Sequence, residues 1–380
     1  MSKQFYSDLK LGVLGGGQLG RMLIQDALNF NLNISILDPD PEAPCKNIAS
    51  EFTVGNLLDF DTVYAFGKKM DMLTIEIEHV NVDALEALEK EGVKIFPQPN
   101  VLRIVQDKGL QKKFYQENGI ATADYFLVEN KNDISDFTSH FPFMQKLRKG
   151  GYDGKGVTKL QDISNFDHAF DAPSVLEKFV DFEKEISVIV ARNSNGEIKT
   201  YPLVELDFNP EANLVEFLFS PANVSAHIEE LASKIAVNVA ESLKIVGILA
   251  VEMFLTKNGE ILVNEIAPRP HNSGHQTIEA NYTSQYEQHL RAILNLPLGA
   301  TTISSAAVMV NLLGEKEYSG SVIYSGLEEV LAMGGVKLHL YGKTTTKPFR
   351  KMGHITILGK TLSEAKEKAI IVKEKLKAIS

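Results

Sequence analysis

The chain has 380 residues, of which 44% are hydrophobic and 23% charged, and its formal net charge is −10 at pH 7. These values are ordinary for a soluble globular protein of two or three domains. An acidic chain of this kind is not expected to bind nucleic acid, and no apolar run approaches the length that spans a bilayer.

Cys45 is the only cysteine, which excludes an internal disulfide and a cysteine zinc cluster. The first residues carry no apolar core of the kind found in signal peptides. We therefore expect a cytoplasmic protein with no membrane partner.

Residues 10–96 alternate short apolar runs with helical patterns, which predicts a parallel sheet with helices on its faces. Ligands of such sheets bind outside the carboxyl ends of the strands. The glycine-rich turn Gly15-x-Gly17-x-x-Gly20 and the segment Glu76–His79 both lie at such ends.

The glycine-rich turn has the spacing of a dinucleotide-binding turn, and Asp38 ends the second apolar run, where an acidic residue would hold a ribose. This favours an NAD-dependent oxidoreductase, but the second parallel half that such a fold needs does not follow. Free N–H groups at the start of the next helix still favour a phosphate. Asp38 is then a strand-end residue with no cofactor ribose to hold.

The pattern is helical over residues 99–119, with Gly119 as the expected C-terminal cap, and then turns to many β runs over residues 121–222. We predict a mixed α/β and α+β protein. Its parts are a Rossmann-like domain (1–98), a central antiparallel domain (99–300) with a small lid-like subdomain (121–180), and a small β-rich domain (301–380).

A second glycine-rich segment, residues 143–160, lies between two β runs and contains Gly150, Gly151, Gly154 and Gly156. Such a loop can fold over phosphates with its N–H groups while nearby lysines supply charge. It can equally be a flexible hairpin tip. Tyr152 and Asp153, which stand between the glycines, favour the phosphate loop.

The segment 247–270 predicts a hairpin around Asn258-Gly259. A two-residue turn places Glu252 opposite Glu265, roughly 5 Å apart at Cβ, and turns Asn264 to the other face. Apolar flanks screen such a like-charged pair poorly, so a divalent cation would relieve it, and Mg²⁺ prefers one or two carboxylates with phosphate oxygens. One shared proton or a slipped register remains the alternative.

Residues 176–180 form an apolar strand whose exposed edge can receive an adenine, and the carboxylate of Glu185 can accept ribose hydroxyls. Taken together, these segments resemble the ATP-grasp ligases. Within them, the chain is similar to the N5-carboxyaminoimidazole ribonucleotide synthetases, on the strings GGGQLGRM, IEIEHVN, QDKGLQKKF, KLRKGGYDGKG, EKFV, NEIAPRPHNSGH and KPFRKMGH, which run in order along nearly the whole chain.

The resemblance implies an ATP-dependent carboxylation of 5-aminoimidazole ribonucleotide with bicarbonate, using Mg²⁺ or Mn²⁺, in purine biosynthesis. It further implies a cytoplasmic homodimer whose product passes to a downstream mutase. Nucleotide contacts are implied for Arg103, Lys146, Gly151, Tyr152, Asp153, Gly154, Lys155, Gly156, Glu177, Lys178, Phe179, Val180, Glu185, Asn264 and Glu265. Metal ligands are implied to be Glu252 and Glu265.

Bicarbonate contacts are implied for Arg269, His271 and Asn272. Contacts with the aminoimidazole ribonucleotide are implied for Gly17, Gln18, Leu19, Glu76, Tyr152, Asp153, Lys155, Arg269, His271, Lys347, Arg350 and Lys351. The first glycine-rich turn would then hold this substrate's 5′-phosphate. Asp153, Lys155, Arg269, His271, Asn272 and Lys351 are the expected catalytic set.

One departure concerns the string Glu205-Leu206-Asp207-Phe208, where related sequences often have a histidine near the nucleotide, so no role is assigned there. The alternatives are a formate-dependent glycinamide ribonucleotide ligase of the same fold, a non-catalytic nucleotide sensor and, less simply, the oxidoreductase.

Overall fold

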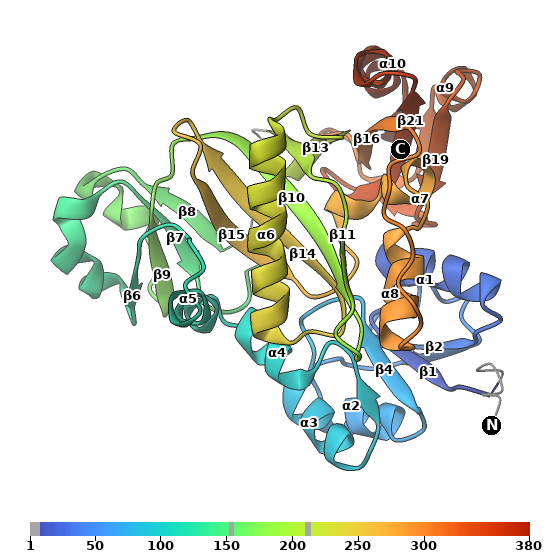
Figure 1. Ribbon diagram of the computed structural model, residues 1–380, viewed down its shortest axis with the longest axis horizontal. Coiled ribbons are helices and arrows are strands. Elements are labelled where there is room, and N and C mark those ends of the chain that lie inside the picture. Colours follow the sequence, from blue (N-terminus) through green and yellow to red (C-terminus); the bar gives the residue numbers. More distant parts are fainter. Residues whose placement is uncertain (1–7, 152–155, 210–213) are drawn as a thin grey trace.

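The computed structural model describes residues 8–151, 156–209 and 214–380, and begins with a parallel sheet. Within the described residues its strand order is β3-β2-β1-β4-β5, drawn in blue in Figure 1. The strands are β1 (Leu11–Leu14), β2 (Ile34–Asp38), β3 (Glu51–Val54), β4 (Met72–Ile75) and β5 (Lys94–Ile95). The parallel sheet predicted for residues 10–96 is confirmed.

Helices cover both faces of this sheet, which explains why its inner strands are continuous apolar runs rather than alternating ones. One face packs against α1 (Gln18–Asn29) and the later helix α8 (Gln285–Ile293). The other face packs against α2 (Phe60–Gly67) and α3 (Val82–Lys90). Each residue of β1 is buried as a result.

The helical pattern over residues 99–119 forms two helices rather than one, α4 (Pro99–Val105) and α5 (Lys108–Glu117). The break falls at Asp107, whose backbone is extended and whose carboxylate accepts hydrogen bonds from the N–H groups of Gly109 and Leu110. A side chain that caps a new helix competes with continuation of the old one. Gly119 follows α5 with a φ of +63°, as expected of a C-terminal cap.

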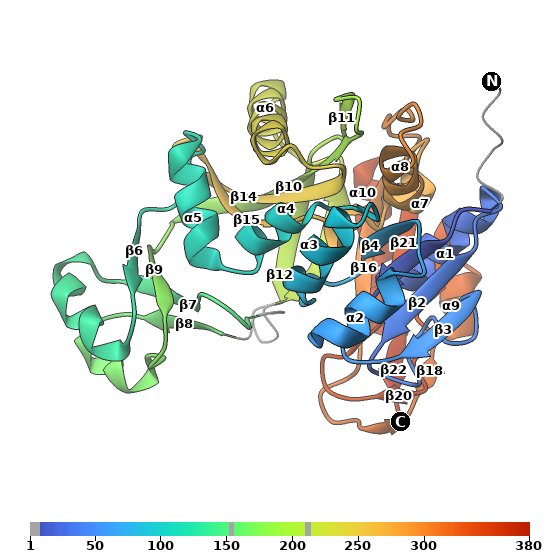
Figure 2. The same cartoon turned by 90° about the horizontal axis from the view of Figure 1, so that it is seen from below.

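A small antiparallel sheet, ordered β6-β9-β7-β8, projects to one side of the molecule (Figure 2). Its strands are β6 (Tyr125–Val128), β7 (Phe143–Leu147), β8 (Val157–Leu160) and β9 (Ser174–Lys178). The short 3₁₀ helices η1 (Lys131–His140) and η2 (Ile163–His168) lie beside it, and Phe143, Leu160 and Leu176 form its small core. The second glycine-rich loop joins β7 to β8.

The central antiparallel sheet runs in the order β15-β14-β10-β12-β13-β16-β21-β19 through the described residues, with β11 paired to β10. Its strands are β10 (Phe182–Arg192), β11 (Ile198–Thr200), β12 (Val204–Asn209), β13 (Leu214–Ser220), β14 (Gly247–Thr256), β15 (Ile261–Ala267), β16 (Ala306–Leu313), β19 (Val336–Leu340) and β21 (Lys351–Gly359). Helix α6 (Ala226–Leu243) lies across β10 and β14 in Figure 1 and shares their core.

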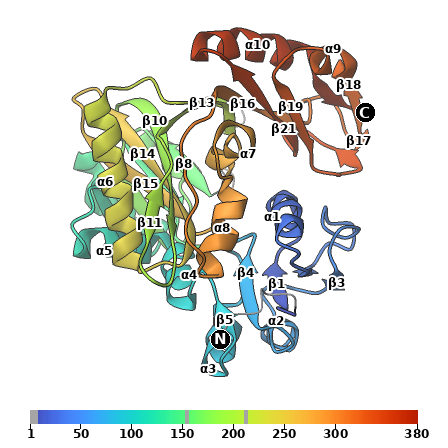
Figure 3. The same ribbon diagram turned by 45° about the vertical axis from the view of Figure 1, so that its right-hand side comes forward.

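This sheet continues past residue 300, because β13 pairs with β16 and β16 pairs with β21. The remaining carboxyl-terminal elements are α9 (Leu327–Leu331), α10 (Leu362–Lys375) and the short strands β17 (Gly320–Ser321), β18 (Ile323–Ser325), β20 (Thr345–Thr346) and β22 (Lys377–Ile379). Figure 3 shows this region above α1, with α8 alongside. Among the described residues, no helix is long and apolar enough to cross a membrane.

His289 on α8 joins the parallel sheet to the central sheet. Its Nδ1 accepts from the N–H of Ile248 at 3.2 Å, and its Nε2 lies 2.8 Å from Oγ1 of Thr74. Since a backbone N–H can only donate, the ring is neutral with its proton on Nε2. Complete burial lowers the pKa of His289 to about 4.

Candidate active site

The hairpin of β14 and β15 places Glu252 directly opposite Glu265, so this predicted pair is confirmed. The register that produces it differs from the expected one. The loop has three residues, since Thr256 pairs with Glu260 and Phe254 therefore faces Leu262 rather than Val263. A register shift between Glu252 and Met253 then restores the expected pairing at the carboxylates.

Asn264 is the extra residue at this bulge, and its predicted orientation toward the other face is wrong. A bulge places two residues opposite one, which changes where the second side chain points. The Oδ1 atom of Asn264 accepts a hydrogen bond of 2.9 Å from Nζ of Lys146, which lies on β7 of the small sheet. The bulge thus brings Asn264 into the same site as the carboxylates.

The two carboxylates differ in their surroundings. Burial, reinforced by the charge of Glu265, raises the pKa of Glu252. The ammonium group of Lys108, 3.3 Å from Oε2 of Glu265, lowers the pKa of Glu265. Two facing carboxylates, one of them held ionised by its neighbours, suit Mg²⁺, which takes its remaining ligands from phosphate oxygens and water.

Lys146 is held by a buried carboxylate that connects two lysines. Oε2 of Glu177 lies 2.7 Å from Nζ of Lys146, and Oε1 lies 3.1 Å from Nζ of Lys112. Burial opposes ionisation of Glu177, but the two ammonium groups outweigh it and lower its pKa. Burial lowers the pKa of Lys112 to about 8. The side chain of Glu177 therefore positions Lys146.

Lys108 and Lys112 were not predicted as site residues. They lie four residues apart in the string QDKGLQKKF and thus share one face of α5. That spacing was the available signal, and it becomes meaningful only once α5 is known to face Glu177 and Glu265.

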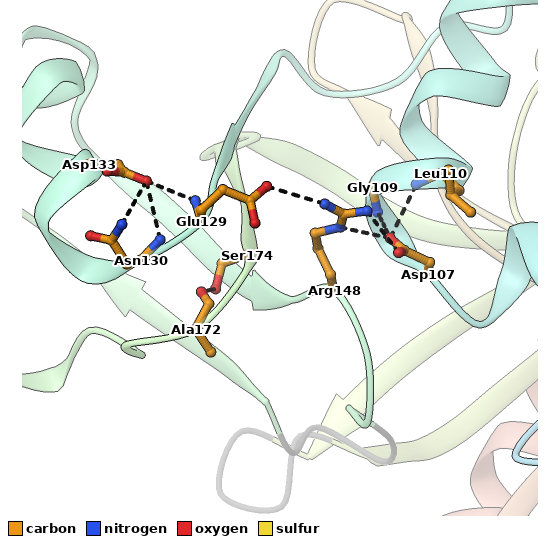
Figure 4. A network of polar contacts seen from close by, with 9 residues as sticks. All are labelled: Asp107, Gly109, Leu110, Glu129, Asn130, Asp133, Arg148, Ala172 and Ser174. Carbon is orange, nitrogen blue, oxygen red and sulfur yellow. Dashed lines mark hydrogen bonds and ion pairs between the residues drawn. The ribbon is translucent and has the colours of Figure 1, made fainter.

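The start of the second glycine-rich loop is tied to α5 by Arg148 (Figure 4). Its Nε and Nη2 atoms donate to the two carboxylate oxygens of Asp107 at 2.9 and 2.8 Å, and Nη1 lies 3.5 Å from Glu129. Lys108 N–H also donates to the carbonyl of Arg148 at 2.9 Å. The lysines of the small sheet and of α5 are thereby fixed relative to each other.

The expected bicarbonate residues follow β15 in one loop. Nε of Arg269 lies 2.8 Å from Oε1 of Glu78, and Nδ1 of His271 lies 3.6 Å from Oε1 of Glu252. Asn272 and Asn311 of β16 exchange amide hydrogen bonds of 2.9 Å in both directions. Glu78 belongs to the segment expected at the ligand-binding end of the parallel sheet, but its pairing with Arg269 was not predicted, and neither was Asn311.

Three N–H groups of the first glycine-rich turn already donate to carboxylates, which argues against the expected phosphate cradle. Gly17 and Leu19 donate to the carboxylate of Glu76 at 3.0 and 3.1 Å, and Gly16 donates to Asp38 at 2.6 Å. A Cβ on Gly17 would lie 2.4 Å from Oε1 of Glu76. The glycines here admit the protein's own carboxylate, which would repel a phosphate at the same donors.

The basic carboxyl-terminal loop reaches this turn through Lys343. Its Nζ lies 3.2 Å from Oε1 of Gln18 and donates to the carbonyl of Lys351 at 2.7 Å. Arg350 donates to Thr345, and Lys347 is exposed. Gln18 and Lys351 are thus brought together, by a lysine that was not predicted.

The other predicted residues differ in where they lie, and Glu185 is near enough to Lys146 and Glu265 to feel their charges. Arg103 forms exposed ion pairs with Asp83 and Glu86 of α3. Lys178 pairs with Asp124, Phe179 is exposed, Val180 is half-buried, and burial raises the pKa of Glu185 to about 7. Gly151 and Gly156 border the loop, whereas Tyr152, Asp153, Gly154 and Lys155 lie outside the described residues.

Three parts of the molecule define an ATP-grasp enzyme: a parallel-sheet domain, a small lid-like sheet and a central sheet. Lysines of α5 and of the small sheet face two carboxylates of the central sheet where these parts meet. Residues 113–286 match the ATP-grasp domain family. Residues 9–106 match the ribonucleotide synthetase preATP-grasp domain, and residues 307–368 match the phosphoribosylaminoimidazole carboxylase C-terminal domain.

Curated relatives are similar along most of the chain. The N5-carboxyaminoimidazole ribonucleotide synthase of Bacillus subtilis is 38% identical, with 94% of each chain covered. The chloroplastic phosphoribosylaminoimidazole carboxylase of Vigna aconitifolia is 40% identical over 97% of this chain and 67% of its own length.

Solved structures agree with this. The N5-carboxyaminoimidazole ribonucleotide synthetase of Thermotoga maritima has a TM-score of 0.91 and 45% identity, covering 98% of this chain and 99% of its own. The Aspergillus clavatus enzyme, in complex with ADP and 5-aminoimidazole ribonucleotide, has a TM-score of 0.89 and 32% identity, covering 97% and 99%. This chain belongs to the N5-carboxyaminoimidazole ribonucleotide synthase family of ATP-grasp ligases.

Proposed function

We propose that the chain carboxylates 5-aminoimidazole ribonucleotide with bicarbonate at the expense of ATP, giving N5-carboxyaminoimidazole ribonucleotide, ADP and phosphate in purine biosynthesis. The observation that supports this most is one cluster in which Lys146 and Asn264 meet at 2.9 Å, with Glu265 and the opposed Glu252 alongside. Such a cluster provides charge for a triphosphate and carboxylates for its metal ion.

In the first step an oxygen of bicarbonate attacks the γ-phosphorus, the bond from that phosphorus to the bridging oxygen of ADP breaks, and carboxyphosphate forms. Phosphoryl transfer needs positioning and charge neutralisation more than covalent protein chemistry. Lys146, held by Glu177, supplies a fixed ammonium group to the phosphates. Mg²⁺ or Mn²⁺ held by Glu252 and Glu265 would neutralise further phosphate charge.

Bicarbonate recognition falls to the loop after β15 in this proposal. The planar guanidinium of Arg269 can bind the carbonate group with two hydrogen bonds, and His271 and Asn272 border the same site. Carboxyphosphate then splits at its bond from carbon to the bridging oxygen, releasing CO₂ and phosphate beside the amine. The amine nitrogen bonds to the carbon of CO₂, and its proton passes to Asp153 or to the released phosphate.

The ribonucleotide is proposed to lie between the first glycine-rich turn and the carboxyl-terminal loop. Gln18 and Glu76 contribute side chains from one side, and Lys347, Arg350 and Lys351 contribute from the other. Since the N–H groups of Gly17 and Leu19 are occupied by Glu76, we assign the 5′-phosphate to the basic loop. Tyr152, Asp153 and Lys155 complete the proposed set.

A phosphate-release assay tests the proposal. We expect ATP turnover that depends on Mg²⁺ and bicarbonate and is stimulated by 5-aminoimidazole ribonucleotide, with carboxylated product equal to phosphate released. Stimulation by formate and glycinamide ribonucleotide instead would refute it, and ATP binding without turnover would leave only a nucleotide sensor.

Three further parts of the proposal rest on the family resemblance. We propose a homodimer, a cytoplasmic location and transfer of the product to a downstream mutase. Light scattering of the purified chain tests the first of these directly. The relative from Vigna aconitifolia is chloroplastic by name, so membership of the family does not by itself fix the location.

A further inference from the structure

Gln285, the first residue of α8, is fully buried, and its side chain forms hydrogen bonds with the backbone of His271. Its Oε1 accepts from the N–H of His271 at 2.8 Å, and its Nε2 donates to the carbonyl of His271, also at 2.8 Å. One side-chain amide therefore satisfies both backbone groups of a single residue. Of the side chains without a titratable group, only a primary amide presents an acceptor and a donor side by side in this way.

The rest of the loop is built around the same amide. Nε2 of Gln285 lies 3.2 Å from Nδ1 of His275, and the N–H of Gln285 donates to Oγ1 of Thr277 at 2.8 Å. A Cβ on Gly274 would lie 2.5 Å from Oε1 of Gln285, so glycine at that position lets the loop close over the amide. The path of residues 271–277 thus depends on where Gln285 lies.

The ring of His271 has a defined proton position because of this path. Its Nδ1 accepts from the N–H of Ser273 at 3.3 Å and lies 3.0 Å from Oγ of Ser273. Oγ of Ser273 in turn lies 2.9 Å from Oγ of the buried Ser187. Since a backbone N–H only donates, the neutral ring carries its proton on Nε2, where it can donate to an anion.

We propose that Gln285 is a positioning residue for bicarbonate, which fixes the backbone of His271 and thereby aims the Nε2 proton of its ring. This inference rests on the proposed function, because it takes bicarbonate to be the anion that His271 meets. Gln285 acts through the backbone and the loop, and among the described residues its amide bonds to His271 and His275 rather than to Glu252, Glu265 or the lysines of α5.

Gln288, one turn further along α8, is a matched control. It is also fully buried, and its amide makes the same two-point contact with another residue. Its Nε2 donates to the carbonyl of Gly299 at 3.0 Å, and its Oε1 accepts from the N–H of Gly299 at 2.8 Å. Replacing either glutamine by methionine keeps a similar volume and removes two hydrogen bonds to the backbone of one residue, and Gln285→Met also removes the contact with His275. Only Gln285 bonds to the bicarbonate loop.

The experiment compares Gln285→Met with Gln288→Met in the phosphate-release assay, with bicarbonate varied at saturating ATP and ribonucleotide. We expect both variants to lose similar thermal stability. Only Gln285→Met raises KM for bicarbonate, by about 10-fold or more, since misplacement of a binding group by 1 Å can cost that much. Its KM for ATP stays unchanged. An equal KM for bicarbonate in the two variants overturns the inference.

A second variant, Gln285→Asn, decides the matter if Gln285→Met does not fold. It keeps an amide in the buried site but is one methylene shorter, so it cannot hold both backbone groups of His271 at hydrogen-bonding distance. A raised KM for bicarbonate supports the inference, and an unchanged one overturns it. A wild-type chain without bicarbonate-dependent turnover refutes the proposed function itself, which separates that failure from failure of the positioning role.

Discussion

The buried imidazole of His289 makes the stability of the chain depend on pH in a predictable direction. Its pKa is lowered from 6.5 to about 4 in the folded chain, so the unfolded chain binds more protons below pH 6.5. Stability is therefore lost as the pH falls from 6.5 toward 4. At pH 5 the protonation of this imidazole raises the unfolding equilibrium constant about 30-fold relative to pH 8. It therefore lowers the free energy of unfolding by about 2 kcal/mol.

The measurement is the free energy of unfolding in urea at pH 8 and pH 5, for the wild type and for His289→Gln. Other groups titrate in both proteins, so only the difference between them reports on His289. We expect the advantage of the wild type to shrink by about 2 kcal/mol between the two pH values. A difference that is constant with pH, or that grows as the pH falls, would refute the reasoning.

Three further substitutions test the site. Glu265→Gln should lower Mg²⁺-dependent phosphate release by about 100-fold or more, because one of two metal-binding carboxylates is lost, and retention of full turnover would exclude a metal role for this residue. Lys112→Met removes one of the two ammonium groups that pair with the buried Glu177 and leaves Lys146 as its partner, so it should cost about 1–3 kcal/mol of unfolding free energy. Lys178→Met at an exposed pair should cost less than about 1 kcal/mol, and equal costs in urea unfolding would contradict this. Asp107→Ala should destabilise the chain more than Asp59→Ala, although both remove a helix cap, since only Asp107 also pairs with a guanidinium; thermal unfolding midpoints compare the two.

The elements of the first ninety-five residues could be predicted because each has a local signal. Apolar runs marked the five parallel strands, and helical periodicity marked α1, α2 and α3. The glycine-rich loops and the pair Glu252 and Glu265 were equally visible in the sequence. The pair was right although the turn was not, since a three-residue loop and a one-residue bulge compensate each other. Bulges and loop lengths have weak local signals in the sequence, which is why the orientation predicted for the side chain of Asn264 was wrong.

The helix break at Asp107 belongs to the same class of error. Its carboxylate caps α5 and is shared with Arg148, 41 residues further along the chain. The local pattern of residues 99–119 is helical throughout, and only the partner from the small sheet shows why Asp107 interrupts it.

What the sequence by itself determined about this protein is its class: a parallel-sheet domain, a glycine-rich loop between strands, and opposed carboxylates on a late hairpin. Tertiary structure decided which groups these residues meet. Glu76 accepts a hydrogen bond from Gly17 of the glycine-rich turn, 59 residues earlier in the chain. Lys146 donates to Asn264, which is 118 residues further along, and Gln285 accepts from the backbone N–H of His271. The physical reason is that periodicity and turn chemistry act over neighbouring residues, whereas hydrogen bonds and ion pairs act wherever packing brings donors and acceptors together.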